Sequence, residues 1–324
     1  MMHIHSRMSC SALLLPLFLC AAAASAAEAP PTPQLEIELS RQHSIYHGRG
    51  DRRLEGYVID RGLASYIHAL MPGFENAIER LGPKDRWLDI GAGRGQAVID
   101  YYAPPTDIQS LSKPQPRKAD TVAMSIEDRR MPEWHQTEAR LEPGQMRYVF
   151  DKPLRAFSAA DLGGEFNLIS DVIGGFSYTE ELAVFMDKVL SLLAVNGNFY
   201  TVLQDVRSEE GDNKPFYPNE PFLTRIFDEK GAETSICAWL RQIQCVEVVC
   251  MPKSGWKPPL QTYRLRKTCN ATTVPKLERS RYVAGTPPER IFRMTPAAKP
   301  ATQPAAAPAA TTPAATAPAA AVAR

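Results

Sequence analysis

The chain has 324 residues, of which 44% are apolar and 23% are charged, and its formal net charge is +1 at pH 7. A balance so close to neutral argues against nucleic acid or an anionic membrane as the partner, because both attract an excess of Lys and Arg. The length suffices for one large domain with its own hydrophobic core, together with flanking segments.

Residues 1–27 have the pattern of a secretory signal peptide. A mildly basic start is followed by an apolar run from Ala12 to Ala24, and the small residues at 24–27 offer a cleavage site. The run is short and Pro16 interrupts it, so we expect its removal and no stable membrane span afterwards. The segment therefore predicts an exported protein, periplasmic or secreted.

Two alternatives to a cleaved signal stay open. Cys20 follows the apolar run and could carry a lipid anchor, but Leu19 precedes it where such an anchor expects a small residue. A cytoplasmic protein whose first residues resemble a signal by chance is the other, although a start at Met8 would leave the apolar run in place.

Residues 28–83 are predicted to form an N-terminal helical cap. Apolar residues recur at intervals of three and four over residues 34–78, which is typical of a helix. Pro72-Gly73 breaks the pattern, and a short further helix is expected from Phe74 to Leu81.

The stretch after the cap predicts a strand, a tight turn and a helix. An apolar run from Arg86 to Ile90 contains the acid Asp89, glycines follow at alternate positions, and a helical pattern continues to Tyr102. Glycine permits a positive φ and leaves no Cβ between the turn and a ligand. A turn that feeds a helix N-terminus also offers N–H groups to an anionic group.

The glycine spacing distinguishes between two classes of cofactor. A dinucleotide fingerprint is G-x-G-x-x-G, but here the order is D-x-G-x-G-x-G and Gln96 stands where that fingerprint has Gly or Ala. The stretch resembles motif I of the class I S-adenosylmethionine-dependent methyltransferases. The resemblance implies that Gly91, Gly93 and Gly95 line the amino-acid end of S-adenosylmethionine. It also implies that Asp89 orients the turn or meets the cofactor's ammonium through water.

Strands alternating with helices predict an α/β fold with a doubly wound, mostly parallel sheet. The two last strands have the character of an antiparallel β-hairpin, and residues 84–270 together resemble the seven-stranded methyltransferase sheet. The further strands are expected at 121–126, 146–150, 166–170, 198–203, 243–251 and 261–268, and the further helices at 179–193 and 222–230.

The end of the second strand departs from the family pattern. The family usually places there an acid that accepts hydrogen bonds from both ribose hydroxyls. In this chain Ser125 occupies that position, and Glu127 and Asp128 follow it. Either Glu127 binds the ribose from an offset strand, or ribose binding is weaker; a solvated helix start is the structural alternative for Glu127 and Asp128.

The fourth strand and its exit carry the second signal. Asp171 and the small Gly174-Gly175 pair resemble the family's strand beside the reactive methyl group, with room for a substrate. No Asn-Pro-Pro-Tyr-like tetrapeptide follows, which disfavours the amino group of a nucleic-acid base as the acceptor. After the third strand, Asp151 is a position that touches adenine in relatives, although a surface acid before Pro153 explains it as well.

Methyl transfer depends mainly on alignment, and a general base is needed only where the acceptor loses a proton. The sequence does not single out one base, but among the histidines it favours His43 and His47, which lie on either side of Tyr46 in the N-terminal cap. The candidates are His43, His47, His68, His135 and Asp171.

Four cysteines remain after residue 27, which in an exported protein predicts one or two disulfides without choosing a pairing. Their spacings, at positions 237, 245, 250 and 269, match no zinc site. Residues 271–295 are expected to be a C-terminal extension, and the Ala/Pro/Thr-rich residues 296–324 a disordered tail.

These features together predict an exported S-adenosylmethionine-dependent methyltransferase that acts on a small molecule or a cell-envelope component. A non-catalytic exported binding protein with the same fold is the alternative, and the missing acid at the second strand favours it. An NAD-dependent oxidoreductase is disfavoured by the glycine spacing. The oligomeric state stays open.

Overall fold

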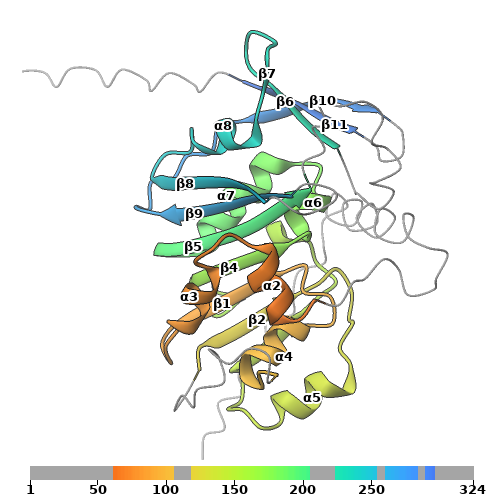
Figure 1. Cartoon of the computed structure of the whole chain (residues 1–324), viewed down its shortest axis with the longest axis vertical. Helices are drawn as coiled ribbons and strands as arrows, with labels where there is room; N and C mark the ends of the chain where they lie inside the picture. Colours follow the sequence, from red (N-terminus) through yellow and green to blue (C-terminus); the bar gives the residue numbers. More distant parts are fainter. Residues whose placement is uncertain (1–60, 106–117, 205–222, 254–259, 284–288, 296–324) are drawn as a thin grey trace, which may run out of the picture.

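The described part of the chain contains a seven-stranded and a four-stranded sheet with helices packed on them (Figure 1). The expected signal peptide, most of the expected cap and the expected tail lie outside the described residues. The computed structural model describes residues 61–105, 118–204, 223–253, 260–283 and 289–295.

The large sheet has the strand order β3-β2-β1-β4-β5-β9-β8. Its first five strands are parallel to one another, and β9 runs antiparallel to both β5 and β8. This confirms a mixed α/β fold with a mostly parallel sheet of seven strands. The strands are β1 (Arg86–Ile90), β2 (Asp120–Met124), β3 (Met146–Val149), β4 (Phe166–Val172), β5 (Leu193–Gln204), β8 (Val246–Lys253) and β9 (Leu260–Lys267).

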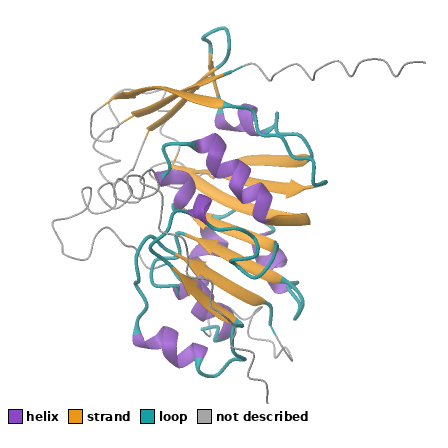
Figure 2. Ribbon diagram, turned by 180° about the vertical axis from the view of Figure 1, so that it is seen from behind, coloured by secondary structure: helices purple, strands orange, loops and turns teal. Residues whose placement is uncertain are grey.

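Helices cover both faces of this sheet, because its inner strands are apolar on both sides. Successive side chains of a strand point to opposite faces, so Trp87 belongs to the core under α2, α3 and α4, and Leu88 to the core under α7. Figure 1 shows the first three helices in front of the sheet, and Figure 2 shows α7 from behind. The helices are α2 (Leu63–Ala69), α3 (Phe74–Glu79), α4 (Gln96–Tyr102), α5 (Pro132–Glu138), the 3-10 turn η1 (Leu154–Ala156), α6 (Gly175–Tyr178), α7 (Leu182–Leu192) and α8 (Ile236–Leu240).

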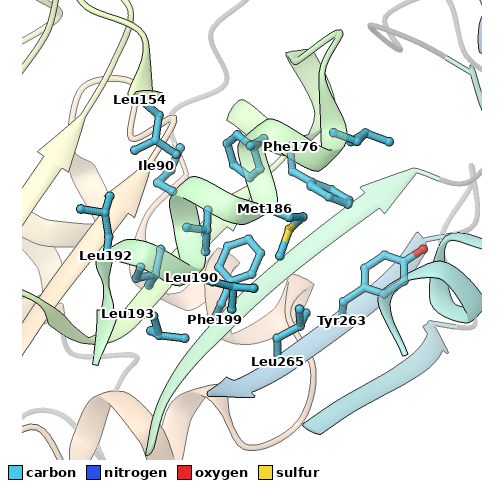
Figure 3. Packing of buried hydrophobic residues seen from close by; sticks show 14 of the residues in the cluster. Ile90, Leu154, Phe176, Met186, Leu190, Leu192, Leu193, Phe199, Tyr263 and Leu265 are labelled. Atoms are coloured by element: carbon cyan, nitrogen blue, oxygen red, sulfur yellow. The ribbon is translucent and has the colours of Figure 1, made fainter. Parts of the chain in front are cut away.

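The core beneath α7 is the larger of the two. Met186 and Leu190 of α7 pack with Phe199 of β5 and with Tyr263 and Leu265 of β9 (Figure 3). All five of these residues have 2% or less of their surface exposed, so α7 is closely packed on this face of the sheet.

The four-stranded sheet has the order β10-β11-β6-β7 and was not predicted. It joins the residues expected to be a C-terminal extension to a segment expected to be a helix. Its strands are β6 (Leu223–Phe227), β7 (Glu233–Thr234), β10 (Leu277–Val283) and β11 (Glu289–Met294).

The predicted helix over 222–230 is wrong. The described residues from Leu223 form strand β6, whose Ile226 is fully buried in the core and pairs with Phe292 of β11. Four of its five residues are apolar or β-branched, which suits either a helix or a strand, and the pairing with a strand more than 60 residues later decides between them.

Smaller differences concern element ends. The helix expected at 179–193 is present as α7, which begins at Leu182, and the short helix α6 precedes it at 175–178. Strand β5 begins at Leu193, five residues earlier than expected. The break at Pro72-Gly73 is present, with Gly73 at a φ of 105° between α2 and α3. Among the described helices, none has the length and apolarity required to cross a bilayer.

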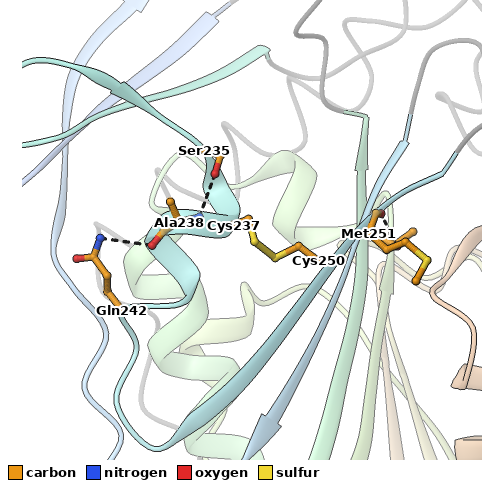
Figure 4. Close-up of a disulfide and its surroundings, with 7 residues drawn as sticks. Ser235, Cys237, Ala238, Gln242, Cys250 and Met251 are labelled. Atoms are coloured by element: carbon orange, nitrogen blue, oxygen red, sulfur yellow. Dashed lines mark hydrogen bonds between the residues drawn. A yellow bond between two sulfur atoms is a disulfide. The ribbon is translucent and has the colours of Figure 1, made fainter.

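Two disulfides link the four cysteines. Cys237 of α8 bonds to Cys250 of β8 (Figure 4), and Cys245 bonds to Cys269, which follows β9. The Cα atoms are 6.1 and 5.2 Å apart, within the range that a disulfide spans. The first bridge therefore holds β8 to α8, and the second joins the residue before β8 to the segment that follows β9.

Candidate functional site

The glycine turn has the backbone conformation that its sequence predicts. Gly91, Gly93 and Gly95 have φ values of 73°, 55° and 78°, in the left-handed region that side chains with a Cβ disfavour. The N–H of Ala92 donates to the carbonyl of Met124 at 2.9 Å, which fastens the turn to the end of β2.

The outer two glycines are required by close packing within the protein. A Cβ on Gly91 would lie 2.5 Å from Cα of Gly174, and one on Gly95 would lie 2.5 Å from the ring of Trp134. The carbonyl of Gly93 accepts a hydrogen bond from the hydroxyl of Tyr148 at 2.5 Å. The turn is thus held from β3, from α5 and from the exit of β4.

A cavity lies beyond the carboxyl ends of β1 to β4. At this point the helices that follow neighbouring strands pack on opposite faces of the large sheet. Helix α4, which follows β1, packs on one face of the sheet, whereas α7, which follows the neighbouring β4, packs on the other. Such a switch point opens a crevice suited to ligands. The lining residues are Arg61, Ile90, Gly91, Gly93, Met124, Ser125, Ile126, Lys152, Pro153, Leu154, Arg155, Ile173, Gly174, Gly175, Tyr178, Thr179, Glu181, Val184, Phe185 and Lys188.

Three of the seven predicted cofactor residues line this cavity: Gly91, Gly93 and Ser125. Glu127 does not line it and forms an ion pair at 3.1 Å with Arg129. Gly95 is also absent from the lining and faces Trp134 instead. The structure thus brings the turn and the end of β2 to one site, while the other four predicted residues do not line it.

Asp89 is completely buried beneath the turn. Its Oδ1 accepts a hydrogen bond from Oγ of Ser170 at 2.7 Å, and its Oδ2 accepts one from the hydroxyl of Tyr66 at 3.1 Å. The indole N–H of Trp87 donates to the same Ser170 Oγ at 2.9 Å. Burial raises the pKa of Asp89 to about 7, although both hydrogen bonds oppose the rise. Asp89 thereby ties α2 to β1 and β4.

Asp171 is buried at the end of β4 and shapes the wall of the cavity. Its two carboxylate oxygens accept hydrogen bonds from the backbone N–H groups of Gly174 and Phe176, each at 2.8 Å. Burial raises its pKa to about 7, and Arg290 is among the groups that oppose this rise. Ile173, which lies between Asp171 and Gly174 in the chain, has a φ of 55°. This value is strained for a β-branched residue, and the hydrogen bonds of Asp171 help to maintain it.

The most prominent lining residues that the sequence did not identify are charged. Lys152 and Arg155 follow β3, Lys188 lies on α7, and Arg61 precedes α2. Glu181 is the one carboxylate among the described lining residues, and its Oε2 is 3.7 Å from Nη1 of Arg155. Only the fold could identify this set, because its members are widely spaced in the chain.

The four candidate histidines lie away from the cavity or outside the described residues, and the fifth candidate base, Asp171, uses both carboxylate oxygens on backbone N–H groups. His43 and His47 are not described, and His68 and His135 are exposed and do not line the cavity. Asp151 is likewise exposed and absent from the lining. Within the described ranges no group of three or more His, Cys, Asp or Glu side chains could hold a metal ion.

Comparison with known proteins gives similarity to solved structures alone, since no family model and no curated protein matches the chain. The N-methyltransferase NodS from Bradyrhizobium japonicum WM9, in complex with S-adenosyl-L-homocysteine, is 13% identical with a TM-score of 0.38, over 71% of this chain and 97% of that one. A SAM-dependent methyltransferase from Thiobacillus denitrificans, also in complex with S-adenosyl-L-homocysteine, is 12% identical with a TM-score of 0.38, over 69% and 97%.

The CurJ carbon methyltransferase is 15% identical with a TM-score of 0.38 over 59% of this chain. The present chain covers 51% of the CurJ chain, about half of its length. Similarities at this level give neither an activity nor a substrate for this protein.

Proposed function

We propose that this protein binds S-adenosylmethionine in the cavity beyond β1 and transfers its methyl group to a small molecule or a cell-envelope component. The observation that carries the proposal is the position of the glycine turn. Gly91 and Gly93 line the crevice at the switch between β1 and β4, together with the ends of β2 and β4.

The residues present fit the cofactor in shape and in apolar surface. A turn without side chains leaves room at Gly93, and the apolar Met124, Ile126 and Leu154 offer a surface for a purine. For the ribose the chain offers the buried Ser125, whose hydroxyl can donate one hydrogen bond and accept others. A carboxylate would accept from both ribose hydroxyls, so Ser125 supports a weaker contact than the family pattern implies.

When bound, S-adenosylmethionine supplies an electrophilic methyl group on a sulfonium sulfur. The protein's part is to align the acceptor, because positioning accounts for most of the acceleration in such a transfer. Gly174 and Gly175 leave space at the exit of β4, and the Asp171 hydrogen bonds hold that exit in place. Where the acceptor must lose a proton, Glu181 is the lining carboxylate that can take it.

Calorimetric titration of the disulfide-intact chain with S-adenosylmethionine, S-adenosylhomocysteine and NAD tests the proposal. We expect the first two to bind and NAD not to bind. Gly93→Val should abolish binding, since the new side chain would enter the cavity. The matched control is Gly144→Val, because Gly144 has a similar φ of 82° with no atom within 4 Å of its Cβ position.

Unchanged affinity in Gly93→Val would refute the placement of the cofactor, and failure of all three ligands to bind would refute the enzyme itself. A non-catalytic binding protein is the second candidate. The ion pair of Glu127 with Arg129 favours it. This pair engages the carboxylate that follows Ser125 in the chain and that could otherwise bind the ribose. Conversion of bound S-adenosylmethionine to S-adenosylhomocysteine speaks against that candidate, since a non-catalytic protein would bind both compounds without converting one into the other.

We also propose that the protein is exported, as its residues 1–27 predict. The two disulfides support this, since such bonds persist in oxidising compartments and are rare in the cytosol. An exported enzyme would need a supply of its cofactor outside the cytoplasm. Amino-terminal sequencing of protein recovered outside the cytoplasm should show cleavage near residue 27. An intact Met1 there would contradict a cleaved signal peptide, and recovery of the protein from the cytoplasm alone would contradict export.

A further inference from the structure

We infer that the cavity binds an anionic group, a carboxylate or a phosphate, held by Lys152, Arg155 and Lys188. If the proposed function holds, the anionic group belongs to the methyl acceptor, so the acceptor is an anionic molecule. This second step rests on the proposed function. The inference comes from the charges that surround the cavity, which the glycine turn does not explain.

The described lining is strongly unbalanced in charge. Four cations line the cavity, Arg61, Lys152, Arg155 and Lys188, against the single carboxylate of Glu181. That carboxylate is 3.7 Å from the guanidinium of Arg155 and offsets one of them. S-adenosylmethionine carries a sulfonium and an ammonium against one carboxylate, so as a whole it would add to the excess of positive charge. Its carboxylate belongs to the amino-acid end, which the proposed function places at the glycine turn. An anion is the ligand that this lining attracts.

The three cations of the proposed site, Lys152, Arg155 and Lys188, come from the segment around η1 and from α7, and these meet at the cavity. Lys152 precedes η1, Arg155 lies in η1, and Lys188 lies two turns into α7. Helix α7 packs against η1, which places these elements side by side. A guanidinium offers a planar pair of donors to a carboxylate or phosphate, and an ammonium offers up to three donors.

The environment of Lys188 points the same way. Partial burial lowers the pKa of its ammonium, and the nearby carboxylates of Asp161 and Asp187 only partly oppose this. The electrostatic attraction to an opposite charge is stronger for a partly buried charged group than for an exposed one, because the local dielectric constant is lower. An anion in the cavity would supply that charge.

Titration of the chain with inorganic phosphate and, separately, with acetate at constant ionic strength tests the inference. We expect saturable binding, seen as a rise of Tm, and the stronger probe identifies the acceptor's group as phosphate or carboxylate. Lys152→Gln combined with Lys188→Gln should weaken binding by about tenfold or more, since each lost charged hydrogen bond carries at least that factor. Lys230→Gln, at an exposed lysine after β6, is the matched control and should bind like the wild type.

S-adenosylmethionine is titrated into the same variants so that the two proposals can fail separately. If it binds the wild type but neither phosphate nor acetate does, the anion site is refuted and the cofactor site stands. If the anions bind and S-adenosylmethionine does not, the proposed function is refuted and the anion site stands. Anion binding that the Lys152/Lys188 double variant retains in full would also refute the site, because the anion would then be bound elsewhere.

Discussion

At the scale of single residues, two carboxylates expected at the cofactor instead hold the protein together. Asp89 lies opposite Ser170 on the neighbouring strands β1 and β4, and Asp171 is the next residue along β4. Each carboxylate uses both oxygens on donors of the protein. Their burial is what raises their pKa values, and a raised pKa ties stability to pH.

The burial of Asp89 predicts a loss of stability as pH rises. Its pKa is 3.8 in an exposed setting and about 7 in the fold. Since the folded state binds the proton more tightly, this group's contribution is complete below about pH 4 and is lost as pH rises to about 7. The free energy of unfolding of the wild type should fall relative to Asp89→Asn, by on the order of 1.4 kcal/mol per pH unit in that window. Urea unfolding of both proteins at several pH values measures the difference.

Asp161→Asn is the control for this pH series. Asp161 is exposed, and hydrogen bonds from the backbone and the hydroxyl of Ser158 lower its pKa. Its contribution is therefore complete above the unfolded pKa and is lost only as pH falls further, which is the opposite sign. A flat difference between wild type and Asp89→Asn over pH 4–7 would show that Asp89 stays ionised in the fold.

At the scale of elements, strand β11 reaches from the small sheet to the wall of the cavity through Arg290. This side chain is completely buried. Its guanidinium donates to Oγ1 of Thr224 at 2.7 Å, to the carbonyl of Phe176 at 3.0 Å and to the carbonyl of Thr179. It also opposes the negative charge of Asp171. The small sheet thus fixes α6, which borders the cavity.

Replacing Arg290 should destabilise the protein strongly. Arg290→Met leaves two carbonyls and a hydroxyl without their donor and removes the cation near Asp171. We expect the free energy of unfolding to fall by about 3 kcal/mol or more, as is usual when one partner of a buried charged network is removed. Urea unfolding measures the loss. Arg293→Met on the exposed side of the same strand is the control, and equal losses in the two variants would contradict this role.

At the scale of the whole molecule, two disulfides fasten the edge of the large sheet. The bridge from Cys237 to Cys250 connects α8 to β8, and the one from Cys245 to Cys269 joins the two ends of the β8–β9 pair. They close segments of 13 and 24 residues in sequence separation. Both restrict the unfolded chain more than the folded one.

Loss of one bridge should lower stability to a measurable extent. Cys237→Ala combined with Cys250→Ala is expected to reduce the free energy of unfolding by about 3 kcal/mol, the usual effect of opening a loop of this size. Guanidinium unfolding of oxidised protein provides the measurement. Under reducing conditions the variant and the wild type should differ far less, and a difference of the same size there would assign the loss to packing.

The sequence alone predicted those elements whose signals are local. Strands β1 to β4 fall within two residues of their expected ends because short apolar runs are bounded there by turns. Strand β6 was predicted as a helix because only its pairing with β11, distant in sequence, favours an extended backbone. The strands β10 and β11 were missed for the same reason.

What the sequence by itself determined is the glycine turn and the strand–helix order around it, since a positive φ at Gly91, Gly93 and Gly95 is a property of each residue's own backbone. The tertiary structure alone decided which side chains face the cavity. It turned Asp89 inward to Tyr66 and Ser170, gathered cations from distant elements, paired the cysteines and built the second sheet. The physical reason is that burial and electrostatics act between groups that are close in space, whatever their separation along the chain.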